Sequence, residues 1–302
     1  MASLITLKRR IGSIRSTRQI TKAMELVSAS KLRRAQEQAR LSRAYREAAY
    51  RLLARLNAMS EITDTAVTAE DVTEQPLFQK RPVDSRLYIV ITSNSGLAGA
   101  YNVNVLKLLA KAIGENQKAG IRSSVITIGN RGVQFVRTLA GVDLLAHYPA
   151  FGDKPTQADI QPILTTILAQ YSSAAVDEVL VLYTLPRSGI LQEAVSVPLL
   201  PAQLDQTDGT DNIPLDLAMN FEPDIPTVIH HITARLIEVQ LWQFVLESLA
   251  SEHSMRMLAM KNATDNANEL IGDYTLEYNT ARQAAITQEL AEITGGAEAM
   301  KG

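Results

Sequence analysis

The sequence has 302 residues, a formal net charge of −2 and no cysteine. This length suffices for one large or two modest domains, and the lack of cysteine excludes disulfides, thiol switches and zinc–thiolate sites. The charge is uneven: residues 1–56 carry 14 Lys or Arg and three acids, a net charge of +11, whereas the remainder carries −13. A basic arm of this kind indicates an anionic partner surface or pairing within the chain.

Residues 1–57 are predicted to form one long helix. From residue 3 this segment has no proline and a single glycine, Gly12, and it is rich in good helix formers such as Ala, Arg and Leu. Small and apolar side chains recur at alternating spacings of four and three residues. This heptad seam predicts a partner helix, and it comprises Ser28, Leu32, Ala35, Ala39, Ser42, Arg46, Ala49, Leu53 and Leu56.

The middle of the chain, residues 86–202, differs in pattern and lies between connectors at residues 58–85 and 203–226. Short β-branched runs alternate with helical stretches, which predicts a largely parallel sheet with helices on its faces. The expected strands cover residues 86–93, 123–129, 142–148, 177–184 and 193–200, and the expected helices cover Val103–Asn116, Gln134–Leu139 and Ala158–Tyr171. The last two strands are joined closely enough for an antiparallel turn at the edge of the sheet.

Residues 227–302 are predicted to form the second long helix. No proline follows Pro226, and residues 224–302 carry 5 Lys or Arg against 11 acids. A basic and an acidic heptad helix at opposite ends of one chain favour an antiparallel coiled coil, left-handed because the repeat is seven residues. Its seam comprises Ile232, Leu236, Val239, Gln243, Leu246, Ala250, His253, Met257, Met260, Thr264, Ala267, Ile271, Tyr274, Tyr278, Ala281 and Ala285.

Residues 92–102, TSNSGLAGAYN, form a loop between a predicted strand and a predicted helix. Glycines at such a turn can hold a phosphate at a helix N-terminus, but neither G-x-G-x-x-G nor G-x-x-x-x-G-K-[ST] is present. Close packing of strand and helix is the alternative. Along the N-terminal helix the arginines surround the axis and the seam requires a helical partner, so a partner helix explains them better than a nucleic acid does. The four histidines show no metal-ligand spacing, and no catalytic, cofactor-binding or metal site is expected.

Four stretches carry a family resemblance. Residues 20–36, ITKAMELVSASKLRRAQ, strongly resemble the N-terminal signature of the gamma subunit of F-type ATP synthases. Residues 250–271 and 278–300 resemble the C-terminal signature of that family. The loop SNSGLAGAYN resembles the one that follows the first strand of the family's middle domain, although Asn94, Ser95 and Ala98 stand where relatives often have Asp, Arg and Cys. The resemblance covers the chain from end to end.

The resemblance implies a non-catalytic rotor subunit of the central stalk. The fold would be a long antiparallel coiled coil with an inserted Rossmann-like α/β domain. The two helices would form a shaft inside the hexamer of alpha and beta subunits, and the α/β domain would meet the epsilon subunit and the ring of c subunits. Ion flow would turn the ring and the shaft and so drive ATP synthesis, at the cytoplasmic face of a bacterial inner membrane, with no cofactor. A free-standing coiled-coil scaffold with an α/β head is the alternative.

The resemblance also assigns contact residues. Met24 matches a family position that affects coupling, and the family's contacts with beta-subunit loops match Arg256, Arg282, Gln283 and Thr287. The C-terminal tip would turn in an apolar bearing through Ile286, Leu290, Ile293 and Met300.

A register for the two helices follows if Met24 and the Arg282–Gln283 pair meet the same level of the hexamer. Paired residue numbers would then sum to roughly 306, and Leu56 would lie near Ala250. Residues 227–249 would project beyond the first helix. Because Leu241, Trp242 and Phe244 make that stretch apolar, the α/β domain is expected to cover it.

Overall fold

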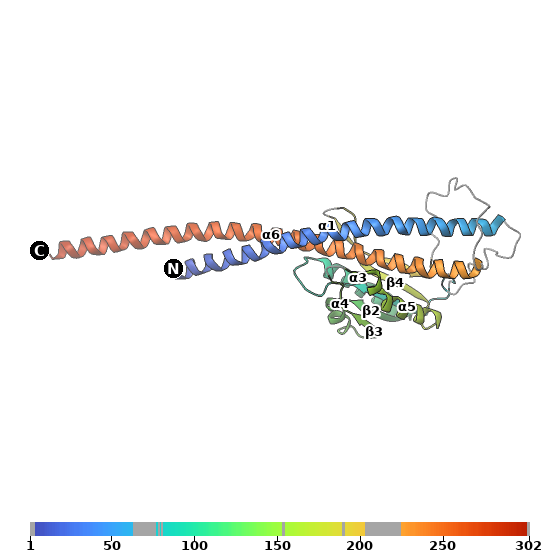
Figure 1. Cartoon of the computed structure of the whole chain (residues 1–302). Coiled ribbons are helices and arrows are strands. Elements are labelled where there is room, and N and C mark those ends of the chain that lie inside the picture. The colour runs from blue at the N-terminus through green and yellow to red at the C-terminus, as the bar shows by residue number, and fades with distance from the viewer. Residues whose placement is uncertain are drawn as a thin grey trace. The chain divides into compact units, whose positions relative to one another are not determined.

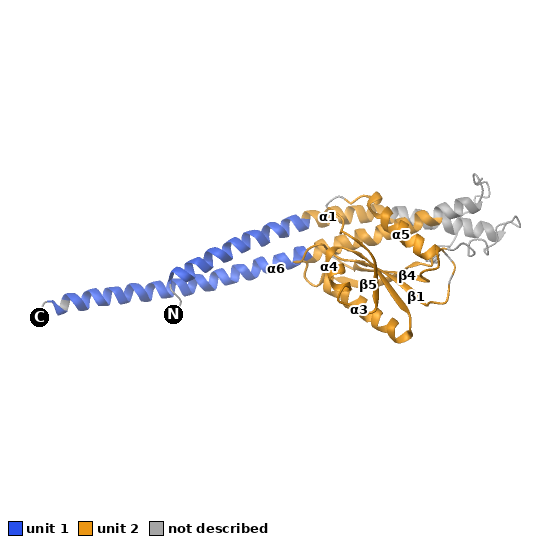
Figure 2. Ribbon diagram, turned by 90° about the horizontal axis from the view of Figure 1, so that it is seen from below, with its two compact units in different colours: residues 1–29, 256–302 blue, residues 30–255 orange. Residues whose placement is uncertain are grey.

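The computed structural model describes residues 4–62, 77, 79, 81–152, 155–188, 191–202 and 225–300, without the side chains of 44–62, 225–232 and 298. Two helices run through both of its compact units: α1 spans Leu4–Ile62 and α6 spans Ile225–Ala299. One unit combines residues 1–29 with 256–302, and the other comprises residues 30–255 (Figure 2). The prediction of a long helix at each end is confirmed; α1 continues to Ile62, five residues beyond the predicted end, and α6 begins at Ile225, two residues before the predicted start.

All five predicted strands are present in one sheet within the unit of residues 30–255. They are β1 (Ser85–Ile91), β2 (Arg122–Ile128), β3 (Val142–Tyr148), β4 (Glu178–Pro186) and β5 (Gln192–Leu200). Their order is β3-β2-β1-β4-β5. The first four strands are parallel, and β5 pairs antiparallel with β4 at the edge, as the short connection between them predicts. Residues of β1 are buried on both faces, as expected for a central parallel strand.

The helices between the strands depart from prediction at two places. Helix α3 (Tyr101–Ala119) contains the predicted range and ends at Gly120, whose φ is +74°. Helix α4 covers Asn130–Val136 rather than Gln134–Leu139, because it begins directly after Gly129 at the end of β2. The last predicted helix is split into a 3₁₀ turn, η1 (Gln157–Ile160), and α5 (Gln161–Ser172). Proline is tolerated in the first turn of a helix, and Pro162 occupies that position in α5.

Helices cover both faces of the sheet and form two cores (Figure 1). Odd-numbered residues of β1, such as Leu87 and Ile89, pack with α5 and α6, whereas Tyr88 and Val90 pack with α3 and α4. The alternation follows from the period of two along a strand. The predicted class, an α/β domain between two long helices, is therefore confirmed.

The apolar stretch of α6 is covered as expected, but the predicted projection is wrong. Leu241 and Phe244 are buried in the sheet core, so the sheet domain does cover this part of the helix. However, Arg43 of α1 lies 3.4 Å from Glu247 of α6, and a groove is lined by Gln38, Leu41 and Ser42 together with Val239 and Trp242. Helix α1 therefore accompanies α6 in the region that was expected to stand alone. The prediction that Leu56 lies near Ala250 concerns a side chain outside the described ones.

No helix within the described residues is both long and apolar enough to cross a membrane.

Two buried tyrosines predict how stability responds to alkaline pH. Burial raises the pKa of Tyr88 and of Tyr171 above the ordinary value of 10.0. A raised pKa in the folded state means that the unfolded chain releases the phenolic proton first, so stability is complete below the unfolded pKa and falls as pH rises through the folded one. We expect the urea midpoint of unfolding to be lower at about pH 11 than at about pH 8, and Tyr88→Phe to reduce that difference. An equal difference in the variant would contradict this origin.

Candidate functional site

The candidate site is the surface of the paired helices in the unit of residues 1–29 and 256–302. Side chains buried between the helices follow one stripe on each: Leu7, Ile11, Thr21 and Ser28 on α1, and Met260, Thr264 and Ala267 on α6. These positions keep the four- and three-residue spacing of a heptad seam. The predicted seam is thus confirmed where side chains are described, and on α1 it continues to Leu7. Much of the remaining surface is exposed.

Three contacts fix an antiparallel register between the helices. The Thr21 and Thr264 hydroxyl oxygens are 2.8 Å apart, and the Arg18 guanidinium donates to Asn268 Oδ1 at 3.2 Å. The Arg10 guanidinium lies 5.9 Å from the centre of the Tyr274 ring, within the range of a cation–π interaction. As the residue number rises along α1 it falls along α6, so the helices run antiparallel.

The predicted register is wrong. Residue numbers sum to 285 for Thr21 with Thr264, not to roughly 306, so the two registers differ by about 21 residues, or three heptads. A shift by whole heptads returns the same face of each helix to the seam, and the seam pattern alone cannot distinguish the two. Met24 therefore does not lie beside Arg282: Thr264, opposite Thr21, is 18 residues from Arg282, or about 27 Å along the helix.

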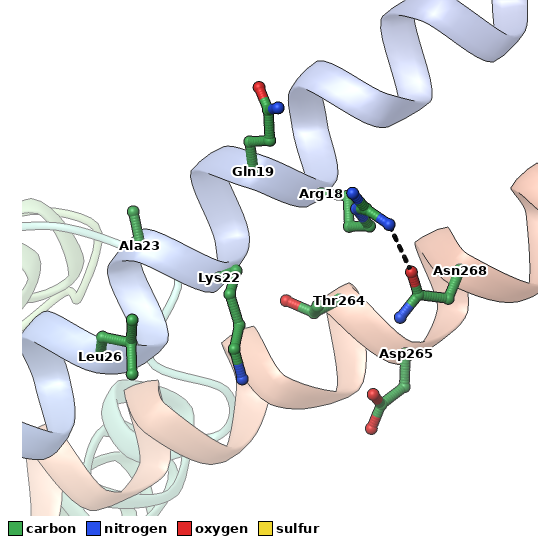
Figure 3. A pocket seen from close by; sticks show the side chains of 8 residues that line it. All are labelled: Arg18, Gln19, Lys22, Ala23, Leu26, Thr264, Asp265 and Asn268. Carbon is green, nitrogen blue, oxygen red and sulfur yellow. Dashed lines mark hydrogen bonds between the residues drawn. The ribbon is translucent and has the colours of Figure 1, made fainter.

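A groove of about 540 Å³ runs beside the Thr21–Thr264 contact, lined by Arg18, Gln19, Lys22, Ala23, Leu26, Thr264, Asp265 and Asn268. Figure 3 shows Arg18 directed towards Asn268 across this groove. Lys22 Nζ pairs with Glu25 at 3.0 Å on the same helix. Since the Lys22 side chain is 53% exposed, this pair contributes only about 0–1 kcal/mol and can exchange for another anion. Leu26 is also exposed, so the groove presents both apolar and cationic groups.

The predicted contact residues lie on the outside of this unit to different degrees. Met24 and Arg256 are half-buried, whereas Arg282, Gln283 and Thr287 are exposed. The Thr287 hydroxyl donates to the Gln283 carbonyl at 2.9 Å, one turn earlier, which is a local bond within the helix. Met24 lies on α1, and the other four extend along α6 from residue 256 to residue 287 rather than forming one cluster. The structure therefore brings none of these side chains together into a catalytic arrangement.

The C-terminal part of α6 extends past the N-terminal end of α1 within this unit (Figure 2). Its apolar side chains are open to solvent: Ile286 is 43% exposed, Leu290 58% and Ile293 67%. Exposed apolar side chains at one end of a helix mark a surface that a partner can cover.

The loop at residues 92–102 holds its polar groups in internal bonds. Ser93 N donates to Asn102 Oδ1 at 3.0 Å, and Asn94 Oδ1 accepts from Ala150 N at 2.9 Å. Thr92 Oγ1 accepts from Gly132 N at 2.9 Å, which ties the loop to α4. These bonds favour the packing role over phosphate binding. Among the described residues, no group of three or more His, Asp or Glu could hold a metal ion.

Sequence reasoning missed the groove beside Thr21 and Thr264. Arg18 and Lys22 lie four residues apart and therefore share one face of α1, which was a usable signal. The residues that line the groove from α6, Asp265 and Asn268, could be assigned only with the correct register.

Comparison with known proteins places these features in a family. The family model described as ATP synthase matches residues 3–300. The chain is 38% identical over 303 residues to the ATP synthase gamma chain of Psychrobacter arcticus, covering 99% of this chain and 100% of that one. It is 40% identical over 306 residues to the ATP synthase gamma chain of Herpetosiphon aurantiacus, covering 99% of each.

Two solved structures show the same fold. A chain in the OSCP/F1/c-ring structure of Euglena gracilis mitochondrial ATP synthase matches with a TM-score of 0.62 at 16% identity, covering 98% of this chain and 94% of that one. A chain in the central stalk and c-ring structure of Tetrahymena thermophila mitochondrial ATP synthase matches with a TM-score of 0.60 at 20% identity, covering 81% of this chain and 99% of that one.

Proposed function

We propose that this chain, which belongs to the ATP synthase gamma-chain family, is the central-stalk rotor of a rotary F-type ATP synthase. It carries no catalytic site of its own in this proposal. Its shaft consists of residues 1–57 and 227–302, and its foot is the α/β domain of residues 86–202. The observation that carries the proposal is a pair of antiparallel helices with a narrow buried seam and a largely exposed outer surface, in a chain similar to gamma chains over its whole length.

The partners follow from the surfaces of the two helices. Lys22, the half-buried Arg18 and the exposed cations of α1 would face acidic loops of beta subunits. Complementary charge guides contact and sets the rate of encounter more than it fixes affinity. Exposed ion pairs worth about 0–1 kcal/mol suit contacts that must break at each step. The exposed tip, with Ile286, Leu290 and Ile293, would turn in an apolar bearing of the alpha and beta subunits.

The foot would meet the epsilon subunit and the ring of c subunits. Ion flow through the membrane would turn that ring and, with it, this chain at the cytoplasmic face of the membrane. Relatives whose structures include the F1 part and the c ring share the fold, which supports this assignment. In this proposal Arg256, Arg282, Gln283 and Thr287 contact the beta-subunit loops at successive levels along α6 rather than at one level.

The proposal is tested by affinity purification of the chain from its own cells. We expect alpha, beta and epsilon subunits to co-purify in a complex that hydrolyses ATP. A chain recovered without ATPase activity, or with unrelated partners, would favour the alternative of a free-standing coiled-coil scaffold.

Met24→Lys is expected to lower coupling while ATP hydrolysis largely survives. Met24 is half-buried near Lys22 and Glu25, so a second cation there would prolong contact with acidic loops. The measurement is proton pumping per ATP hydrolysed in membrane vesicles. Met24→Gln, which keeps a similar side-chain length but adds no charge, is the control and should retain pumping. Unchanged pumping per ATP in Met24→Lys would show that this position does not affect coupling here.

The isolated chain is expected neither to hydrolyse ATP nor to bind it tightly. It lacks the G-x-x-x-x-G-K-[ST] loop, and polar groups of residues 92–102 are held in hydrogen bonds within the chain, Ser93 with Asn102 and Asn94 with Ala150. Calorimetric titration of ATP into the purified chain checks this expectation, and micromolar affinity would contradict it.

A further inference from the structure

A buried carboxylate on α6 joins three elements of the unit formed by residues 30–255. Glu247 is only 5% exposed. Its Oε2 accepts a hydrogen bond from the Tyr183 hydroxyl of β4 at 3.0 Å. Its Oε1 accepts from Gln243 Nε2 on the same helix at 2.8 Å and lies 3.4 Å from the Arg43 guanidinium of α1. Sheet and both long helices thus meet at one side chain.

Neighbouring residues of α6 strengthen this attachment to the sheet domain. The Phe244 ring stacks on Tyr183 with centres 4.8 Å apart. The Ser248 hydroxyl lies 2.7 Å from the Tyr101 hydroxyl of α3. The shortest directional contacts between α6 and the sheet domain therefore lie at residues 244–248, around Glu247, whereas the Arg235–Gln157 and Gln192–Ser254 hydrogen bonds farther along α6 are longer, at 3.3 and 3.4 Å.

The surrounding interface is different in kind. Leu236, Ile237, Leu241 and Val245 pack in the apolar core against the sheet. Apolar attraction has no preferred direction, so these residues hold the helix to the sheet but select one register less sharply than a directional bond does. A buried carboxylate opposes a slide or roll of the helix, because displacement would leave a desolvated charge without its partners.

We propose that Glu247 is the positioning residue that fixes α6, and with it α1, in one register on the sheet domain. Its role in coupling rests on the proposed function: torque applied to the foot reaches the shaft through this contact. The Tyr183–Glu247 bond is its principal part, because Arg43 is half-exposed and its contact is longer.

The register is tested first in the isolated chain by a double-mutant cycle of Tyr183→Phe and Glu247→Gln. Urea unfolding is followed by the emission of Trp242, the single tryptophan, five residues before Glu247. We expect the double variant to lose clearly less stability than the two single losses together, because both changes act on one bond, which Tyr183→Phe removes and Glu247→Gln weakens by replacing a charged acceptor with a neutral one. Tyr171→Phe provides the matched control, since its buried hydroxyl donates to Gln79 O at the same 3.0 Å. It should combine additively with Glu247→Gln, and additivity in both pairs would overturn the proposal.

The role in coupling is tested in complexes reconstituted with alpha, beta and epsilon subunits and the membrane sector. We expect Glu247→Gln and Tyr183→Phe to pump fewer protons per ATP than the unaltered chain, and Tyr171→Phe to retain full pumping. Full pumping in all three variants would overturn the coupling role. Failure of the unaltered chain to pump would instead contradict the proposed function, and the double-mutant cycle would still decide the register.

Discussion

Replacing Gly129 by alanine is expected to destabilise the sheet domain severely. Gly129 has a φ of +99°, and a Cβ atom there would lie 2.2 Å from the Thr92 carbonyl oxygen and 2.8 Å from Thr92 Oγ1. Neither neighbour can withdraw easily, because Thr92 N donates to Ile128 O and Gly129 N donates to Tyr148 O, both at 2.8 Å. The substitution would thus disturb the ends of β1, β2 and β3 at once.

The free energy of unfolding is expected to fall by about 4 kcal/mol or more, since the substitution combines a left-handed backbone with a clash against main-chain atoms. Urea unfolding monitored by circular dichroism measures it. Gly114→Ala is the matched control: Gly114 lies inside α3, and a Cβ atom there meets nothing within 4 Å. That change should stabilise by about 0.5–1 kcal/mol. Equal stabilities for the two variants would refute the inference that a Cβ atom at Gly129 has no room beside Thr92.

A disulfide between Thr21→Cys and Thr264→Cys is expected to form almost completely on mild oxidation. The hydroxyl oxygens of the two residues are 2.8 Å apart in the buried seam, which brings their Cβ atoms close to the separation that a disulfide requires. The chain has no other cysteine, so any crosslinked band on a non-reducing gel reports this pair alone.

The control pair for the crosslink is Met24→Cys with Arg282→Cys, which tests the register in which residue numbers sum to roughly 306. No disulfide should form between these two cysteines within one molecule. Efficient crosslinking of the control pair, with little at Thr21 and Thr264, would contradict the observed register. In a rotor the two helices turn as one body, so the complex with the Thr21–Thr264 crosslink should retain its ATPase activity.

Most of the fold could be predicted because its determinants are local. Seam positions such as Ser28, Ala35 and Thr264 follow from the heptad spacing, and the strands follow from β-branched runs bounded by turns. The antiparallel edge strand β5 follows from its short connection to β4. Helix α4 was misplaced because its start depends on Gly129, whose importance comes from a contact with Thr92 that lies 37 residues away in the sequence.

The register and the groove could not be predicted because they depend on long-range contacts. The seam of a heptad repeat is unchanged by a shift of seven residues, so only specific pairs such as Thr21 with Thr264 and Arg18 with Asn268 select one register. The expectation that Met24 and Arg282 share a level rested on their supposed common partner, not on a contact between them. Glu247, likewise, showed in the sequence only as an acid within an apolar stretch.

Direct observation of rotation tests the central claim most sharply. Lys111 is exposed on α3 of the sheet domain, and a cysteine introduced there can carry a bead while the alpha and beta subunits are fixed to a surface. With ATP present, the bead is predicted to turn in one direction in steps and to stop when ATP is removed. A complex that contains this chain and hydrolyses ATP while the bead stays fixed would contradict the assignment of the chain as a rotor.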